Sequence, residues 1–183
     1  VEFVKSKKAG FSIRSQQKQT TGYSISFWIK DFSDGKICSS GDMNMKLVCS
    51  ATGYLQLLIK RRTGLYDGKT GMPEVRTFTL DFDDIVDYMY NGWHLMTLLY
   101  ELKTNRYYLY INGKLSGSHS ANLEIKGDNW QCTEWTFGST WRDGNYIDMK
   151  LDNIRLYSRA LTAEDIAEIY EEEKSLQSEN IQL

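Results

Sequence analysis

One segment in the last third of the chain gathers aromatic, charged and amide side chains. Residues 141–146 read Trp-Arg-Asp-Gly-Asn-Tyr, which places Trp141, Arg142, Asp143, Asn145 and Tyr146 within six positions. Sugars present apolar C–H faces and a ring of hydroxyl groups, so a site for them needs an aromatic platform beside planar polar side chains. The segment therefore predicts a carbohydrate-binding loop. The alternative is that Trp141 folds back as a lid on the edge of the core.

Two further segments have the same character. Trp130 follows a polar turn and is a second candidate for stacking on a sugar face. Tyr66 and Asp67 lie in the glycine-rich stretch 61–72, which either closes over a ligand or forms a solvated hairpin tip. Loops held by a rigid scaffold are where binding residues concentrate, so both segments are candidate parts of a site.

Tyrosines at alternating positions have two interpretations. Tyr108 and Tyr110 share one face of a predicted strand, because side chains alternate along an extended chain. If that face is solvated and concave, the pair forms a stacking strip; if it faces the core, the rings are filler. Tyr88 and Tyr90 could line the same end of the molecule as the 61–72 stretch.

Short strands must position these side chains. Segments with strand character follow one another from Phe11 to Tyr157, with Gly and Asn at the joints. This pattern is typical of a sandwich or jelly roll and not of a parallel α/β fold. Asn112-Gly113 is the strongest turn signal, because a type I′ turn needs positive φ at both central residues. No repeat or linker divides the chain, so we expect one domain over residues 1–183.

The chain ends with a predicted strand and a predicted helix. Residues 150–157 alternate between a face with Asp152, Ile154 and Leu156 and a face with Leu151, Asn153, Arg155 and Tyr157. Thr162 with Asp165 forms a variant capping box, and an apolar stripe follows at Ile166, Ile169 and Tyr170. We predict one short amphipathic helix over about 162–174, followed by a tail over 175–183.

The ordered segments resemble a known family. The stretches 22–30, 92–100, 106–114, 137–139 and 150–173 are similar in type and order to the strand signatures of laminin-G-like, concanavalin A-like jelly-roll domains. The resemblance covers Tyr23 to about Glu173. It implies an all-β sandwich of two antiparallel sheets with one C-terminal helix. It also implies that Trp28 and Trp93 pack between the two sheets.

Catalysis has little support in the sequence. Glucanases of this fold resemble one another in a Glu-x-Asp-x-(x)-Glu strand, which places an acid and a nucleophile in one cleft. That spacing is absent: Glu134 lacks the partner acids, and Glu168 and 171–173 belong to the predicted helix, where we expect solvent. His94 follows Trp93 and has a structural interpretation, while His119 has no evident partner. We predict that the domain is not an enzyme.

A metal site is an open alternative. Domains that resemble this one often bind calcium through loop carboxylates and backbone carbonyls, and the acid-rich loops here are 31–34, 81–87 and 143–148. None has EF-hand spacing, and no His/Cys cluster has zinc spacing. Asp152 aligns with a family aspartate that anchors the last strand through neighbouring backbone. Calcium therefore stays a possible cofactor, with no certain ligand set.

Composition excludes other classes. The net charge is −2 with no concentrated basic stripe, which argues against nucleic-acid binding by phosphate neutralisation. No run of about 18 apolar residues predicts a transmembrane helix, and the sequence opens without a Met or a signal segment.

The three cysteines leave two interpretations open. Cys38 and Cys49 flank a predicted turn and could bridge, which would leave Cys132 over. Buried free thiols are the favoured interpretation.

Together these observations predict a non-catalytic, lectin-like carbohydrate-binding module of a secreted or cell-surface protein. We expect it to be extracellular or on a bacterial surface, and part of a larger protein. The first alternative is a protein-adhesion or structural laminin-G-like module, which would use an exposed apolar or charged sheet face. The second is a glycoside hydrolase or lyase of the same fold, which would need convergent catalytic groups in a groove.

Overall fold

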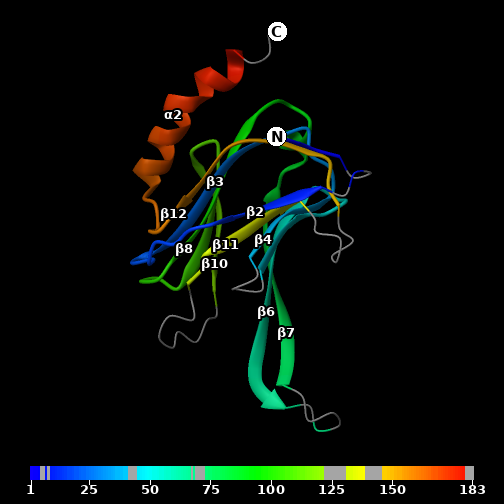
Figure 1. The fold of residues 1–183 in the computed structure, drawn as a ribbon, viewed down its shortest axis with the longest axis vertical. Coiled ribbons are helices and arrows are strands. Elements are labelled where there is room, and N and C mark those ends of the chain that lie inside the picture. Colours follow the sequence, from blue (N-terminus) through cyan, green and yellow to red (C-terminus); the bar gives the residue numbers. More distant parts are fainter. Residues whose placement is uncertain are drawn as a thin grey trace.

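The computed structural model describes residues 1–4, 7, 9–40, 45–66, 68, 73–121, 131–138 and 146–179. Within them, twelve strands form two antiparallel sheets of six strands each (Figure 1). The helix-side sheet has the order β1 (Glu2–Phe3), β12 (Met149–Tyr157), β3 (Gly22–Lys30), β8 (His94–Glu101), β9 (Arg106–Ile111) and β10 (Lys114–Ser120). The second sheet has the order β2 (Gly10–Arg14), β11 (Glu134–Gly138), β4 (Gly35–Ser40), β5 (Met45–Cys49), β6 (Tyr54–Tyr66) and β7 (Pro73–Asp84).

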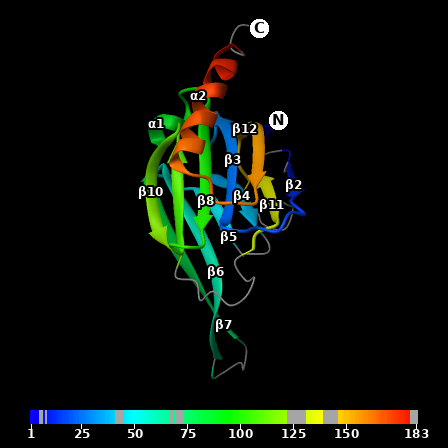
Figure 2. The ribbon, with the colours of Figure 1, turned by 90° about the vertical axis from the view of Figure 1, so that its left-hand side faces the viewer.

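Two helices complete the described part. α1 (Val86–Met89) is a single turn between β7 and β8, and α2 (Ala163–Glu179) lies across the outer face of the helix-side sheet (Figure 2). The predicted all-β sandwich with one C-terminal helix is confirmed. No described helix combines the length and apolar character needed to cross a membrane.

β3 is buried along nearly its whole length, because one of its faces packs on the second sheet and the other packs under α2. Ile25, Phe27 and Ile29 enter the core between the sheets. On the other face, the Trp28 ring is 1% exposed and stacks on Tyr170 of α2, with 5.9 Å between ring centroids. The expectation that Trp28 packs between the sheets is therefore wrong. The aromatic ring instead fills the interface between sheet and helix.

The turn between β9 and β10 has the predicted geometry. Asn112 has φ of 51° and Gly113 has φ of 76°, the positive values that a type I′ turn requires. A Cβ on Gly113 would lie 3.3 Å from Cβ of Tyr170 and 3.4 Å from Cα of Ala167. Glycine therefore allows the turn to approach α2 closely.

The predicted faces of the last strand are wrong beyond Asp152. The pairing with β3 shifts register between Asp152 and Arg155, and Asn153 takes a left-handed φ of 45°. Such a bulge adds a residue and changes which side chains face inward. Ile154 and Leu156 consequently face the core along with Leu151, and the polar positions around them face α2.

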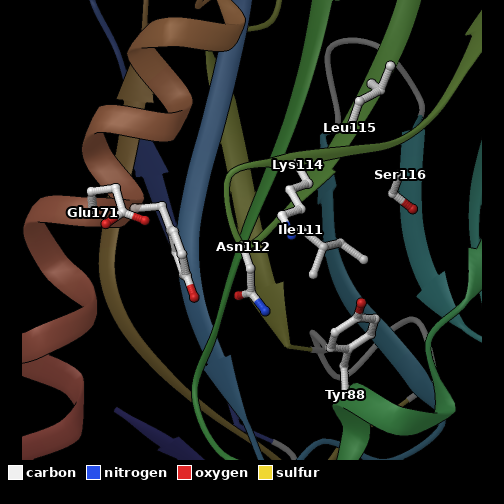
Figure 3. Close-up of a pocket in the computed structure, with 8 residues that line it drawn as sticks. Tyr88, Ile111, Asn112, Lys114, Leu115, Ser116 and Glu171 are labelled. Atoms are coloured by element: carbon white, nitrogen blue, oxygen red, sulfur yellow. The ribbon is translucent and has the colours of Figure 1, made fainter.

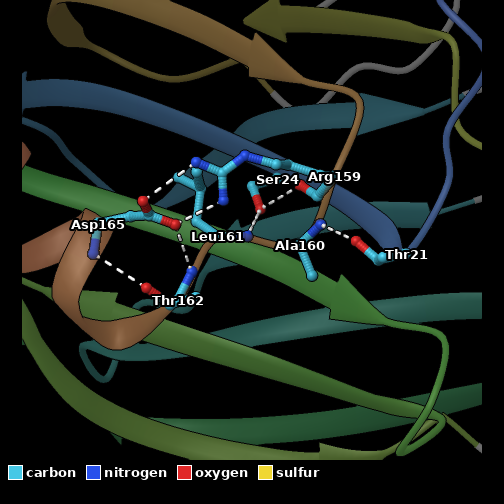
Figure 4. A network of polar contacts seen from close by, with 7 residues as sticks. All are labelled: Thr21, Ser24, Arg159, Ala160, Leu161, Thr162 and Asp165. Atoms are coloured by element: carbon cyan, nitrogen blue, oxygen red, sulfur yellow. Dashed lines mark hydrogen bonds and ion pairs between the residues drawn. The ribbon is translucent and has the colours of Figure 1, made fainter.

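The capping box is confirmed, and the helix is longer than predicted. The Thr162 amide donates to Asp165 Oδ2 at 2.8 Å, and the Asp165 amide donates to Thr162 Oγ1 at 3.1 Å (Figure 4). The hydrogen bond from the Arg159 guanidinium is the main reason that the pKa of the Asp165 carboxyl lies well below its usual range. The hydrogen bond from the Thr162 amide lowers this pKa further. α2 continues to Glu179 because its second half also packs on the sheet, through Glu173 and Gln177, both buried.

Replacing Thr162 with alanine is expected to lower the free energy of unfolding by about 1 kcal/mol, the usual worth of an N-cap side chain. Urea unfolding followed by circular dichroism measures this difference. Thr162→Ser should retain most of the stability, and Glu168→Ala, an exposed change in the same helix, is the control. Equal losses for Thr162→Ala and Thr162→Ser would contradict the role of the hydroxyl.

The cysteines are not bridged. Cys38 lies opposite Leu47 and Cys49 lies opposite Gly35 in the β4–β5 register, so the two are offset along the hairpin. All three thiols are reduced and buried. Burial raises the pKa of the Cys49 thiol to about 11, with a smaller contribution from Asp34, and burial also raises the pKa of Cys38. The interpretation as buried thiols is confirmed.

Candidate functional site

Most of the candidate carbohydrate-binding residues from the three predicted segments lie outside the described residues: Asp67, Trp130, Trp141, Arg142, Asp143 and Asn145. Tyr146 is described and half-buried, and its carbonyl oxygen lies 2.6 Å from where a Cβ on Gly35 would be. Tyr66 ends β6, where it pairs with Pro73. The roles of the undescribed residues stay predictions.

The described backbone separates Tyr66 from Tyr146. β6 and β7 form a long hairpin that extends away from the rest of the sandwich (Figures 1 and 2). Gly35 pairs with Cys49, and Cys49 pairs with Leu55, so Tyr146 lies at the level of the start of β6. Tyr66 lies at the other end of that strand, roughly 35 Å away at the rise of an extended chain. The two tyrosines therefore do not share one site.

Tyr108 and Tyr110 face outward from the helix-side sheet. Tyr107, which precedes them, is buried in the core, while both are half-buried beside Leu99, Leu161 and the start of α2. They line a hollow of about 420 Å³, here called the tyrosine hollow. Its full lining is Thr21, Leu99, Glu101, Tyr108, Tyr110, Ala160, Leu161, Thr162 and Ala163. The pair therefore does not fill the core between the sheets, and its role as a stacking strip stays a prediction.

The tyrosine hollow has an apolar floor and a polar rim. Glu101 accepts hydrogen bonds from the Thr104 hydroxyl at 2.6 Å and from the Tyr108 hydroxyl at 3.4 Å. Burial is the main cause that raises the pKa of Tyr110, and neighbouring Tyr108, Glu164 and Glu101 add to it. The phenol therefore stays protonated and can donate a hydrogen bond.

Hydrogen bonds between side-chain hydroxyls and backbone fix the wall formed by the loop before α2. The Ser24 hydroxyl donates to the Arg159 carbonyl at 3.0 Å and accepts from the Leu161 amide at 2.9 Å (Figure 4). The Ala160 amide donates to Thr21 Oγ1 at 3.3 Å. The loop between β12 and α2 is thus tied to β3 and to Thr21 directly before it.

A second hollow of about 600 Å³ lies further along α2 and is here called the lysine hollow (Figure 3). It is bounded by α1, the β9–β10 turn and α2, with the lining Tyr88, Ile111, Asn112, Lys114, Leu115, Ser116, Tyr170 and Glu171. Leu115 lies opposite Tyr110 in the β9–β10 register, so both side chains point to the same side of the sheet. The two hollows therefore meet along the Tyr110–Leu115 pair, whereas Lys114 pairs with the core residue Ile111 and points to the other side of the sheet.

The two histidines have supporting contacts. His94 Nδ1 lies 3.0 Å from Asn112 Nδ2, and the His94 ring packs edge-on against Tyr88 with 4.9 Å between centroids. Burial is the main cause that lowers the pKa of His94. His119, for which the sequence indicates no partner, contacts the Asp81 carbonyl oxygen through Nε2 at 2.6 Å and packs against Phe82. In the described part of the chain, no three His, Cys, Asp or Glu residues are grouped to hold a metal ion.

Comparison with known proteins identifies the family. A profile described as the concanavalin A-like lectin/glucanases superfamily matches residues 5–167. The chain belongs to this superfamily. A search of curated proteins finds no match.

Solved structures with this superfamily's jelly-roll fold include three botulinum neurotoxin domains. The receptor binding domain of mosaic serotype C/D has a TM-score of 0.63 at 19% identity, over 93% of this chain and 41% of that chain. The serotype D ligand binding domain in complex with N-acetylneuraminic acid has a TM-score of 0.59 at 20% identity, over 89% and 40%. The type G receptor binding domain has a TM-score of 0.53 at 18% identity, over 90% and 42%. These likenesses show the fold, and the chain spans about two-fifths of those chains.

Sequence reasoning from the lectin/glucanase signature misses the lysine hollow. It places Tyr88 at an end of the sandwich, but it does not connect Lys114, Tyr170 and Glu171 with that residue. One signal could have found it: the Asn112-Gly113 turn can approach α2 only because glycine has no side chain, which brings the residues after the turn beside the middle of the helix.

Proposed function

We propose that the domain is a non-catalytic carbohydrate-binding module of a secreted or cell-surface protein. The observation that carries this proposal is the outward-facing pair Tyr108 and Tyr110 in the tyrosine hollow. Aromatic rings at alternating strand positions lie about 7 Å apart and form a strip on which the apolar face of a sugar can stack. Because both rings come from β9, which pairs with β8 on one side and β10 on the other, the backbone that carries the strip is fixed before ligand arrives.

Polar groups around the strip suit sugar hydroxyls. The Glu101 carboxylate has acceptor capacity beyond the two hydrogen bonds it receives, since an ionised carboxylate offers about four lone-pair positions. Thr21 and Thr162 each carry an exposed hydroxyl whose oxygen accepts a hydrogen bond from a backbone amide. This bond does not use the hydroxyl proton, so each group can still donate to a ligand. Acceptors and donors therefore flank an aromatic platform.

The same lining argues against glycoside hydrolysis. Hydrolysis by either the retaining or the inverting route requires two carboxyl groups that face one bond. Among the described residues that line the tyrosine hollow, Glu101 is the single carboxylate. The botulinum domains with this fold are titled as receptor or ligand binding domains, and one is complexed with N-acetylneuraminic acid, which supports a binding role.

A glycan array with and without calcium, followed by titration calorimetry of the best ligand, tests the proposal. Tyr108→Ala and Tyr110→Ala should each weaken binding about tenfold or more, because a lost stacking contact of about 1.4 kcal/mol corresponds to tenfold. Tyr54→Ala removes another partly exposed tyrosine, at 46% exposure on the other sheet, and should leave affinity unchanged.

A Trp141→Ala variant is measured in parallel, because residues 141–146 remain a predicted part of the site. Loss of binding in Trp141→Ala with full binding in both tyrosine variants would move the site to that loop. A silent array with folded protein would contradict carbohydrate binding and favour the protein-adhesion alternative.

A further inference from the structure

Three hydrogen-bond donors in the lysine hollow have no partner among the described residues. They are the hydroxyls of Tyr88 and Tyr170 and the ammonium of Lys114. The contacts of the two tyrosines are made by their rings, on His94 and on Trp28 respectively. Asn112, by contrast, is engaged: its Oδ1 accepts from the Leu95 amide at 3.0 Å.

The charge balance of the lysine hollow favours an anion. The carboxylate of Glu171 forms an ion pair with Lys174 one turn further along α2. Lys114 has no such partner in the described chain, so its positive charge is not compensated locally. Two phenolic donors and one ammonium suit a carboxylate, since charge-assisted hydrogen bonds to an ionised acceptor are about twice as strong as neutral ones.

The two tyrosine donors are held in position. Tyr170 is fixed by its ring stacked on buried Trp28, and Tyr88 by its edge contact with His94. Lys114 directly follows the Asn112-Gly113 turn, which lies against α2. A group bound here would meet two phenol donors that need little reordering, which lowers the cost of binding, while the exposed Lys114 side chain is ordered as it binds.

The lysine hollow adjoins the tyrosine hollow at one residue pair and extends round the end of β9 and β10 to Lys114 and Ile111. Leu115, which is 55% exposed and lines the lysine hollow, lies opposite Tyr110, which lines the tyrosine hollow. We infer that the lysine hollow is an acid-binding subsite: a sugar stacks on Tyr108 and Tyr110 while the carboxylate of an adjacent acidic sugar is bound by Lys114, Tyr88 and Tyr170. This inference rests on the proposed function and assigns its ligand to acidic saccharides.

Matched glycan pairs test the inference with the full chain. The array presents each neutral oligosaccharide beside the same chain that carries a terminal N-acetylneuraminic or glucuronic acid, and also beside the methyl ester of that acid. The acidic member is expected to bind at least tenfold more tightly than the neutral member and the ester. The preference should fall as salt concentration rises, because Lys114 is at the surface.

Variants then locate the preference. Lys114→Met should abolish the preference for the acid and leave the neutral member unchanged, whereas Lys114→Arg should retain it. Tyr88→Phe and Tyr170→Phe, which keep the rings, should each reduce the preference several-fold. Lys18→Met is the control, because it makes the same change in net charge at an exposed loop position.

The outcomes separate this inference from the proposed function. Equal binding of acidic, neutral and ester forms, with loss in Tyr108→Ala, would overturn the subsite and leave the carbohydrate-binding proposal standing. An acid preference that survives in Lys114→Met and in both phenylalanine variants would also overturn it. Absence of any glycan binding would overturn both.

Discussion

Replacing Glu173 with alanine is expected to lower the free energy of unfolding by about 3 kcal/mol, near the lower end of what removal of one partner costs in a buried ion pair. Glu173 is 7% exposed, although the sequence places it on a helix expected to face solvent. Its Oε2 accepts from Trp28 Nε1 at 2.7 Å and from Asn153 Nδ2 at 3.3 Å, and its Oε1 pairs with Arg155. The variant leaves those donors without their acceptor.

The size of this effect follows from where each partner lies. Trp28 is 1% exposed, so its indole N–H cannot turn to water after the carboxylate is removed. An unsatisfied buried donor costs about 1–3 kcal/mol. The Arg155 side chain is 39% exposed and can recover part of its hydration, which keeps the expected total near 3 kcal/mol and not higher.

Urea unfolding monitored by tryptophan fluorescence measures the loss, with Glu172→Ala as the control for an exposed glutamate at the preceding position. A double-mutant cycle with Trp28→Phe should give a coupling energy of about 1 kcal/mol or more, as expected for residues in direct contact. Equal stability of the Glu172 and Glu173 variants would refute the buried contact. Because α2 forms walls of both hollows, Glu173→Ala should also weaken glycan binding.

Features that depend on local chemistry could be predicted from the sequence. The Asn112-Gly113 turn and the Thr162–Asp165 capping box each involve residues a few positions apart, and both are present. The shared face of Tyr108 and Tyr110 was also predicted correctly, because side-chain direction in a strand follows from position alone. What alternation could not decide was which face meets the core and which is hollowed.

Features that depend on distant packing could not be predicted. The bulge at Asn153 reverses the faces of the last strand, and nothing in the residues 150–157 indicates where an extra residue enters the ladder. The burial of Glu173 follows from Trp28, which lies far away in sequence and meets the helix only in the folded chain. A prediction made from the helix residues alone therefore places the Glu173 carboxylate in solvent.

Gly22→Ala is expected to cost more than about 4 kcal/mol, a range reached when a substitution forces backbone apart or strains it. Gly22 begins β3 with φ of +149°, and a Cβ there would lie 1.9 Å from the carbonyl oxygen of Tyr100 and 3.1 Å from Cβ of Ala160. The Tyr100 carbonyl belongs to the central strand β8 and cannot yield as a flexible side-chain end would. Thermal unfolding of the purified variant measures the loss.

Gly92→Ala separates strain from collision in this prediction. Gly92 also has a positive φ, +102°, but no atom lies within 4 Å of the position that an added methyl group would take, so that variant should cost about 1–2 kcal/mol for strain alone. The excess loss in Gly22→Ala then measures the collision with Tyr100. Equal losses would mean that β8 relaxes. A Cβ on residue 22 would also press on Ala160, which lines the tyrosine hollow. Under the proposed function, a relaxed Gly22→Ala protein should therefore still show altered glycan affinity, so this glycine matters to both the fold and the candidate site.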